Sequence, residues 1–209
     1  MKIPTLFLFA CLVGALSAAD AASDHACCSA LAAGAFTKNS LYQIEAAFTT
    51  DAGRPVSLGD FRGGPVVLAM FFSSCNYACP ILVADLQGLQ EKLPAETRGR
   101  TRFVLVSFDS EHDTPRVLTE YRNLHQLDDR WVLLHGDRDA VRELAALLGV
   151  KYRQETNGSF SHSNLITILN AEGEITRQRA GLREALDETA TALTTMAKSE
   201  AHPGTGGSR

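Results

Sequence analysis

Uncharged runs recur along the chain and predict strands that are buried on both faces. The clearest run is Pro65–Phe72, in which every side chain is apolar. Arg102–Phe108 is nearly as apolar after its first residue, and Trp131–Leu134 is a shorter stretch of the same kind. Strands with this pattern lie in the middle of a sheet whose two faces are covered by helices.

Between these runs, apolar residues recur at helical spacing. Leucines at positions 82, 86, 89 and 93 are four, three and four residues apart, which places them on one face of a helix. Asp137 and Gly149 are suited to the two ends of a later helix, and Pro115 is suited to the first turn of another. We therefore expect helices over Ile81–Leu93, Thr114–Leu127, the segment between Asp137 and Gly149, and Leu182–Met196.

Turn residues indicate two hairpins, one at each end of this alternation. Leu41–Thr50 and Pro55–Leu58 flank Asp51-Ala52-Gly53, and Leu165–Leu169 and Glu174–Arg179 flank a turn that ends at Gly173. Strands that alternate with helices and end in a hairpin predict an α/β fold. We expect a single domain with a central mixed sheet flanked by helices and an N-terminal β-hairpin.

The N-terminus has the composition of an export signal. Lys2 precedes an apolar run over 3–19, and small residues follow it. We predict a signal peptide over 1–22, with an uncleaved anchor or lipidation at Cys11 as alternatives, and an exported protein that is periplasmic or membrane-attached facing the periplasm. We expect a flexible segment over 23–40, a folded domain over 41–197 and a disordered tail over 198–209.

The charge pattern excludes some partners. The net charge is −4, and basic residues form no run longer than two. The sequence therefore gives no indication of nucleic-acid binding.

A cysteine pair, Cys75-x-x-x-Cys79, follows the first central strand directly and is followed by Pro80. Such a loop lies at the carboxyl edge of an open α/β sheet, where these folds bind ligands. A pair between this strand and its helix is typical of the thioredoxin plan. We expect Pro80 to be the first residue of the helix, so that the helix N-terminus lowers the pKa of both thiols. The pair can form a structural disulfide, act as a redox dithiol, or bind a metal.

His162 is the candidate for a third donor, because it precedes the strand whose entry loop packs against the cysteine loop in the thioredoxin plan. Oxidoreductases of that plan carry a cis-proline there, whereas this chain has no proline between Pro115 and Pro203. The pattern favours metal ligation over general thiol exchange. Two thiolates and one imidazole suit Cu(I), can hold Cu(II) and could bind Zn(II).

Several motifs in order resemble the SCO/SenC family of copper chaperones and thiol–disulfide proteins of cytochrome c oxidase assembly. They are Gly63-Gly64-Pro65-Val66-Val67, Cys75-x-x-x-Cys79-Pro80, Val106-Ser107-Phe108-Asp109-x-x-x-Asp113-Thr114-Pro115, and His162 ahead of a strand. The resemblance covers about residues 41–195. It implies a thioredoxin-like fold with Cys75, Cys79 and His162 as copper ligands, and with Asp109 as a neighbour of those ligands.

The resemblance further implies delivery of copper to the copper-bearing subunit of cytochrome c oxidase, with other copper carriers or thiol reductants as further partners. Asn76 departs from the family, which usually has proline after the first cysteine. His25 with Cys27-Cys28 is also outside the family pattern. We favour incidental thiols on a flexible segment there, over an auxiliary copper-binding arm or a resolving thiol.

Three other functions use the same cysteines. The main alternative is a thiol–disulfide reductase that keeps the copper-site cysteines of the oxidase reduced, and Cys75 and Cys79 would then form its redox dithiol. A peroxidase and a redox or copper sensor are further alternatives. For Asp113, which precedes Thr114-Pro115, we expect a helix cap, and for Asp109 loop capping competes with a place beside the ligands.

Overall fold

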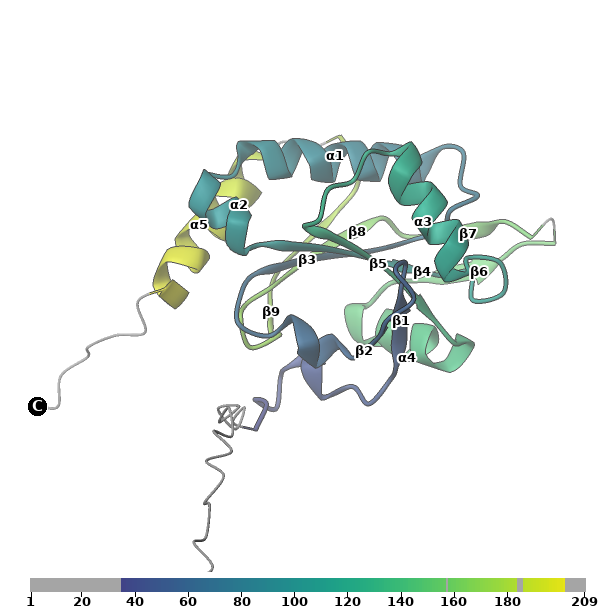
Figure 1. Cartoon of the computed structure of the whole chain (residues 1–209), viewed down its shortest axis with the longest axis horizontal. Coiled ribbons are helices and arrows are strands. Elements are labelled where there is room, and N and C mark those ends of the chain that lie inside the picture. Colours follow the sequence, from purple (N-terminus) through teal and green to yellow (C-terminus); the bar gives the residue numbers. More distant parts are fainter. Residues whose placement is uncertain (1–34, 157, 184–185, 202–209) are drawn as a thin grey trace, which may run out of the picture. The chain divides into compact units, whose positions relative to one another are not determined.

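Strand β3 lies near the middle of the main sheet, at the position that the uncharged run after Pro65 predicts. The computed structural model describes residues 35–201 apart from 157, 184 and 185. All six residues of β3 (Val66–Phe71) are buried. Within the described residues the main sheet has seven strands, in the order β2-β1-β5-β4-β3-β8-β9 (Figure 1). Its other strands are β1 (Phe48–Thr50), β2 (Pro55–Val56), β4 (Arg102–Ser107), β5 (Trp131–Gly136), β8 (Leu165–Leu169) and β9 (Ile175–Ala180).

The sheet is mixed. Strands β3, β4 and β5 run parallel, whereas β8 and β9 on one side and β1 and β2 on the other pair antiparallel. The three parallel strands end at the same edge, so the loops that follow β3 and β4 emerge next to each other. The expected α/β fold with a central mixed sheet is confirmed.

Helices cover both faces of this sheet, with α1 and α3 on one side and α4 on the other (Figure 1). The leucine stripe of α1 faces the core, because Leu82, Leu86 and Leu89 are each at most 1% exposed. Among the described residues no helix is long and apolar enough to cross a membrane. The helices are α1 (Ala78–Lys92), α2 (Ala95–Arg100), α3 (Pro115–Leu124), α4 (Arg138–Leu148) and α5 (Asp187–Ala201), with short 3-10 helices η1 (Leu41–Gln43) and η2 (Leu58–Phe61).

The predicted ends of α3 and α4 are confirmed in part. Asp137 accepts a hydrogen bond from the N–H of Ala140 at 2.8 Å, and Gly149 ends α4 with φ of 72°. For α3, Pro115 occupies the first turn as expected, but the cap is Thr114, whose hydroxyl oxygen accepts from the N–H of Val117. Asp113 is therefore not the helix cap that we expected, since Thr114 already fills that position.

The folded part of the chain begins earlier than residue 41. Ser40 forms an isolated bridge with Glu174, and the N–H of Leu41 donates to the carbonyl of Gly173. Residues 41–43 are helical rather than part of the first hairpin, whose strand β1 starts only at Phe48. The packing of this segment on the β8–β9 turn orders the last residues of the expected flexible segment. Cys11, His25, Cys27 and Cys28 lie outside the described residues.

The C-terminal helix also differs from the prediction. It begins at Asp187 rather than near Leu182 and continues to Ala201, so the domain end expected at residue 197 falls inside α5. Part of this helix packs against α1 and α2, and Leu193 and Ala197 are buried. Helix α2, which the sequence pattern did not predict, forms most of the connection between α1 and β4.

A second, two-stranded sheet formed by β6 (Tyr152–Gln154) and β7 (Phe160–His162) was not predicted. The two strands pair antiparallel, with Tyr152 opposite His162. His162 therefore ends a strand, whereas the sequence placed it in a loop. This hairpin holds the histidine over the carboxyl edge of the main sheet.

Candidate metal centre

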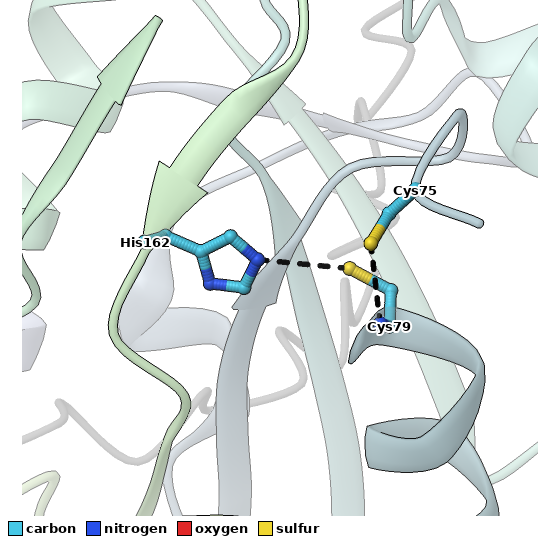
Figure 2. Close-up of side chains that lie close together, drawn as sticks. All are labelled: Cys75, Cys79 and His162. Carbon is cyan, nitrogen blue, oxygen red and sulfur yellow. Dashed lines mark hydrogen bonds between the residues drawn. The ribbon is translucent and has the colours of Figure 1, made fainter. Parts of the chain in front are cut away.

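Three side chains from separate elements meet at the carboxyl edge of the sheet. Cys75 lies in the loop after β3, Cys79 in the first turn of α1, and His162 at the end of β7 (Figure 2). The Sγ atoms of the two cysteines and a ring nitrogen of the histidine all lie within 4.8 Å of one another. The Sγ atom of Cys79 is 3.9 Å from Nε2 of His162. The structure thus brings together the three residues that the sequence analysis selected.

Helix α1 begins at Ala78, two residues before Pro80 and three before Ile81, where the leucine pattern places its start. Tyr77 is its N-cap and Pro80 is its third residue rather than its first. This position is compatible with proline, because the first four N–H groups of a helix have no acceptor within the helix. Cys79 is consequently helical and fully buried, while Cys75 stays in the loop and is partly exposed.

The helix N-terminus acts on the thiol of Cys75. The N–H of Cys79 donates to Sγ of Cys75 at 3.3 Å. Burial by itself would raise the pKa of Cys75, but the N–H groups of Cys79, Tyr77 and Ala78 and the Cys79 thiol together outweigh it, so the pKa is lowered. Hydrogen bonds to a thiolate stabilise the charged form, which is both the nucleophile and the metal ligand.

The thiol of Cys79 behaves in the opposite way. Burial raises its pKa far above that of an ordinary thiol, and the negative charges of Cys75 and Asp113 add to this effect. The expectation that both thiols have lowered pKa values is therefore correct for Cys75 and wrong for Cys79. A bound cation would replace the proton on Cys79 and offset the same repulsion.

The imidazole of His162 has the form that a metal ligand requires. Burial lowers the pKa of His162, so the ring is neutral at physiological pH. Its Nδ1 atom lies 3.3 Å from the carbonyl oxygen of Ser163. With the proton assigned to Nδ1, that N–H donates to Ser163 and the lone pair of Nε2 faces Cys79.

Aromatic rings fix the plane of this imidazole. The ring centroids of Phe72 and Phe108 lie 5.9 Å and 5.0 Å from that of His162. Phe108 also stacks on Tyr152 at 4.8 Å and faces Phe160 at 6.2 Å. Phe108 therefore connects the end of β4 to both strands of the hairpin that carries His162.

The donor set fits a soft metal ion. Two thiolates and one imidazole suit Cu(I), Cu(II) or Zn(II). An ion about 2.3 Å from each sulfur needs ligand atoms that are about 4 Å apart, and the separations of up to 4.8 Å are close to that value. Small side-chain rotations would complete three-coordinate binding.

The two acidic residues after β4 have different partners, and the loop contacts are the alternative that the structure shows for Asp109. The carboxylate of Asp109 accepts from the N–H groups of Glu111 and His112 and contacts Nδ1 of the His112 ring at 2.9 Å. Asp109 thus makes its contacts within its own loop. Asp113 instead accepts from the N–H of Ser73 at 2.8 Å and from two serine hydroxyls, and its charge acts on Cys79.

Comparison with known proteins decides the family. The sequence profile described as SCO1/SenC matches residues 37–198, which is more than half of the chain. The chain belongs to the SCO1/SenC family. A SCO1 protein homolog of Bacillus subtilis is 27% identical over 146 residues, or 68% of this chain and 75% of that protein. A Stutzerimonas stutzeri protein that is named for copper binding is 28% identical over 126 residues, or 58% of this chain and 61% of that protein's length.

Solved structures share the fold of this SCO1/SenC chain. Bradyrhizobium japonicum ScoI with copper bound superimposes with a TM-score of 0.63 at 18% identity, covering 72% of this chain and 96% of that one. Yeast Sco1 with copper bound gives a TM-score of 0.62 at 19% identity, over 74% and 87% of the two chains. The thioredoxin-like fold of this family is therefore confirmed.

The candidate metal centre of this SCO1/SenC chain is open on one side. A surface pocket of about 430 Å³ lies in front of Cys75 and His162. Tyr77, at its rim, is 79% exposed. A ligand from a partner can therefore approach Cys75 and His162, whereas Cys79 lies behind them in the core. The pocket is lined by Phe72, Ser74, Cys75, Asn76, Tyr77, Ala78, Ser159, Phe160, Ser161 and His162.

Proposed function

We propose that this chain binds copper through Cys75, Cys79 and His162. The observation that carries the proposal is the convergence of two sulfurs and one imidazole nitrogen from three separate elements within 4.8 Å. Relatives of the same fold from Bradyrhizobium japonicum, Arabidopsis thaliana and yeast have been solved with copper bound. The soft donor set supports copper as the ion.

Each ligand has a separate role in uptake. Cys75, with the lowered pKa, supplies a thiolate at the open side and makes the first bond to the ion. Cys79 releases its proton when the ion arrives, because the cation removes the penalty for a buried thiolate. His162 needs no proton release, since its ring is already neutral. The reduced dithiol is therefore the state that loads.

We further propose that the copper is cargo and that it passes to the copper-bearing subunit of cytochrome c oxidase. The open pocket in front of Cys75 supports this role, because a ligand of the partner protein can bind the ion before Cys79 dissociates from it. One structural relative is described as a member of the Sco family of cytochrome c oxidase assembly proteins. Transfer by such ligand exchange leaves the ion coordinated at every step.

We place this activity outside the cytoplasm, in the periplasm or at a membrane that faces it. Lys2 with the apolar run after it supports export. A SCO1/SenC relative from Bacillus anthracis is described as a lipoprotein. The mass of the N-terminus of the exported protein distinguishes cleavage from anchoring.

Copper titration of the reduced chain tests the site. We expect the wild type to bind one copper ion at this centre with thiolate-to-Cu(II) absorption, and His162→Ala to change that absorption and weaken binding about 10- to 100-fold. His135→Ala, in β5, is the matched histidine control and should bind as the wild type does. An unchanged spectrum and affinity in His162→Ala would exclude this assignment.

The asymmetry of the two thiols favours a second candidate, a thiol–disulfide reductase. The Cys75 thiolate would attack a partner disulfide, forming a mixed disulfide and releasing one partner thiolate. Cys79 would lose its proton and attack Cys75, which releases the second partner thiolate. The chain's dithiol is oxidised and the partner's disulfide is reduced. A reduction potential too high to reduce partner disulfides would exclude this activity, which would also not depend on His162.

A further inference from the structure

Asp113 is a buried carboxylate that the proposed copper chemistry does not use directly. It is 1% exposed, and its position next to Thr114 is not explained by helix capping. Its hydrogen-bond donors are neutral groups: the N–H and hydroxyl of Ser73 and the hydroxyl of Ser107. A carboxylate is costly to bury, and its hydrogen bonds offset that cost only while all partners stay in place.

These bonds join the cysteine loop to the neighbouring strand. Ser73 is two residues before Cys75, and Ser107 is the last residue of β4. The next link is made by the N–H of Cys75, which donates to the carbonyl of Phe72 at 3.3 Å. Beside the backbone pairing of β3 with β4, a side-chain path from the end of β4 to the first sulfur ligand thus runs through the two oxygens of Asp113.

We propose that Asp113 is a positioning residue of the metal centre and that it acts chiefly by geometry, with its charge on Cys79 as a smaller effect. It holds the start of the cysteine loop so that Sγ of Cys75 lies within reach of both Cys79 and His162. The proposal rests on the copper site proposed above, but the position of the dithiol that it predicts can also be measured without metal.

Asparagine can test geometry and charge separately. The Oδ2 atom of Asp113 accepts from the N–H of Ser73 and from Ser107, while Oδ1 accepts from the hydroxyl of Ser73. In Asp113→Asn the amide oxygen can keep the first two bonds, and the amide N–H₂ can donate to the Ser73 hydroxyl, which is able to accept. The negative charge is removed while the connection remains. Asp113→Ala removes both.

The experiment compares these two variants by copper titration of the reduced whole chain. Asp113→Asn should keep the wild-type Cu(II) absorption and an affinity within about threefold, whereas Asp113→Ala should change the absorption and weaken binding about 10- to 100-fold. Ser73→Ala should shift both readouts in the same direction as Asp113→Ala, but less. Asp51→Ala is the matched control, because Asp51 is another buried carboxylate, which pairs with Arg122 away from the cysteines.

A second readout needs no copper. The metal-free variants are equilibrated with oxidised and reduced dithiothreitol, so that Cys75 and Cys79 form their disulfide as the reagent disulfide is reduced. Tryptic cleavage yields one peptide, residues 63–92, that contains both cysteines, and its mass gives the oxidised fraction. The equilibrium should shift at least about threefold in Asp113→Ala and stay at the wild-type value in Asp113→Asn.

The outcomes separate the possibilities. Wild-type behaviour of Asp113→Ala, or equal losses in Asp113→Asn and Asp113→Ala, would overturn the positioning role. If Asp51→Ala loses copper as strongly as Asp113→Ala, the effect is loss of fold and the proposal fails. If Asp113→Ala does not fold, Ser73→Ala decides, and unchanged readouts there contradict the proposal. If the wild type binds no copper, the proposed function fails while the dithiol equilibrium still tests Asp113.

Discussion

At the residue scale, the two cysteines of one short loop have opposite properties. Cys75 is partly exposed and receives N–H groups from the start of α1, whereas Cys79 is buried one turn away. A single thioredoxin-like helix N-terminus therefore does not activate both thiols. The pair therefore combines an accessible sulfur with a lowered pKa, on Cys75, and a buried sulfur with a raised pKa, on Cys79.

This asymmetry predicts an order of alkylation. With iodoacetamide, Cys75 should be modified first. Because the pKa of Cys75 is lowered, its alkylation should stay fast at pH values where an ordinary thiol is protonated and reacts slowly. Cys79 should stay unmodified across pH 6–9, because burial raises its pKa far above that range. Mass spectrometry of the tryptic peptide over residues 63–92 locates the label. Cys75→Ser gives the background rate of Cys79, and faster labelling of Cys79 than of Cys75 in the wild type would contradict this order.

The sequence could select the three candidate ligands because the cysteine pair follows a predicted central strand, and because the thioredoxin plan and the family motifs distinguish His162 from the other five histidines. Residue types could not assign Asp109 and Asp113. Both follow β4 and both can cap a turn, and only the packed structure shows which carboxylate reaches Ser73. The position of Pro80 likewise depends on where α1 begins, which tertiary packing sets.

At the element scale, the hairpin of β6 and β7 is the part of the site that the sequence pattern did not predict. Its strands have three residues each and alternate only weakly between apolar and polar positions. The main sheet was predictable because β3 and β4 are long and apolar. The hairpin is stable because Tyr152, Phe160 and His162 pack on Phe108, a contact between distant segments that local pattern cannot reveal.

Phe108→Ala should therefore loosen the hairpin and with it the imidazole ligand. We expect copper affinity to fall about 10-fold or more, while alkylation of Cys75 changes little, because Phe108 has no part in the helix N-terminus. Titration and alkylation of the same sample measure the two effects. Phe103→Ala, which removes a ring that stacks on Trp131 instead, controls for lost core packing. Wild-type copper affinity in Phe108→Ala would contradict this prediction, because it would show that copper binding does not need the packing of Phe108 on the hairpin.

At the scale of the whole molecule, the start of the folded chain is fixed on the turn between β8 and β9. Gly173 in that turn has φ of 82°, and a Cβ atom there would lie 2.5 Å from the ring of Tyr42. The ring and the backbone therefore both require glycine at this position. The contact links residues about 130 positions apart in the chain, as shown by the hydrogen bond from Ser40 to Glu172.

Gly173→Ala should lower the free energy of unfolding by about 1–3 kcal/mol, through strained backbone and displacement of Tyr42. Denaturant unfolding measures this change. Gly99→Ala is the matched control, because Gly99 lies in α2 with open space at its Cβ position, and alanine there should be neutral or stabilising by up to about 1 kcal/mol. Copper binding should be unchanged in both variants. A neutral Gly173→Ala would mean that the turn can move away from Tyr42.

The first residues of the domain pack on the turn between β8 and β9, and this position matters for any attachment of the protein through its N-terminus. Val66, at the start of β3, pairs with Leu169 near the Gly173 turn, whereas Cys75 follows the other end of β3. Six strand residues separate these ends by roughly 20 Å. A tether on residues before 35 would thus pull on the edge of the sheet that is remote from the thiols. The face that carries Cys75 and His162 would then remain accessible to a partner while the chain is attached.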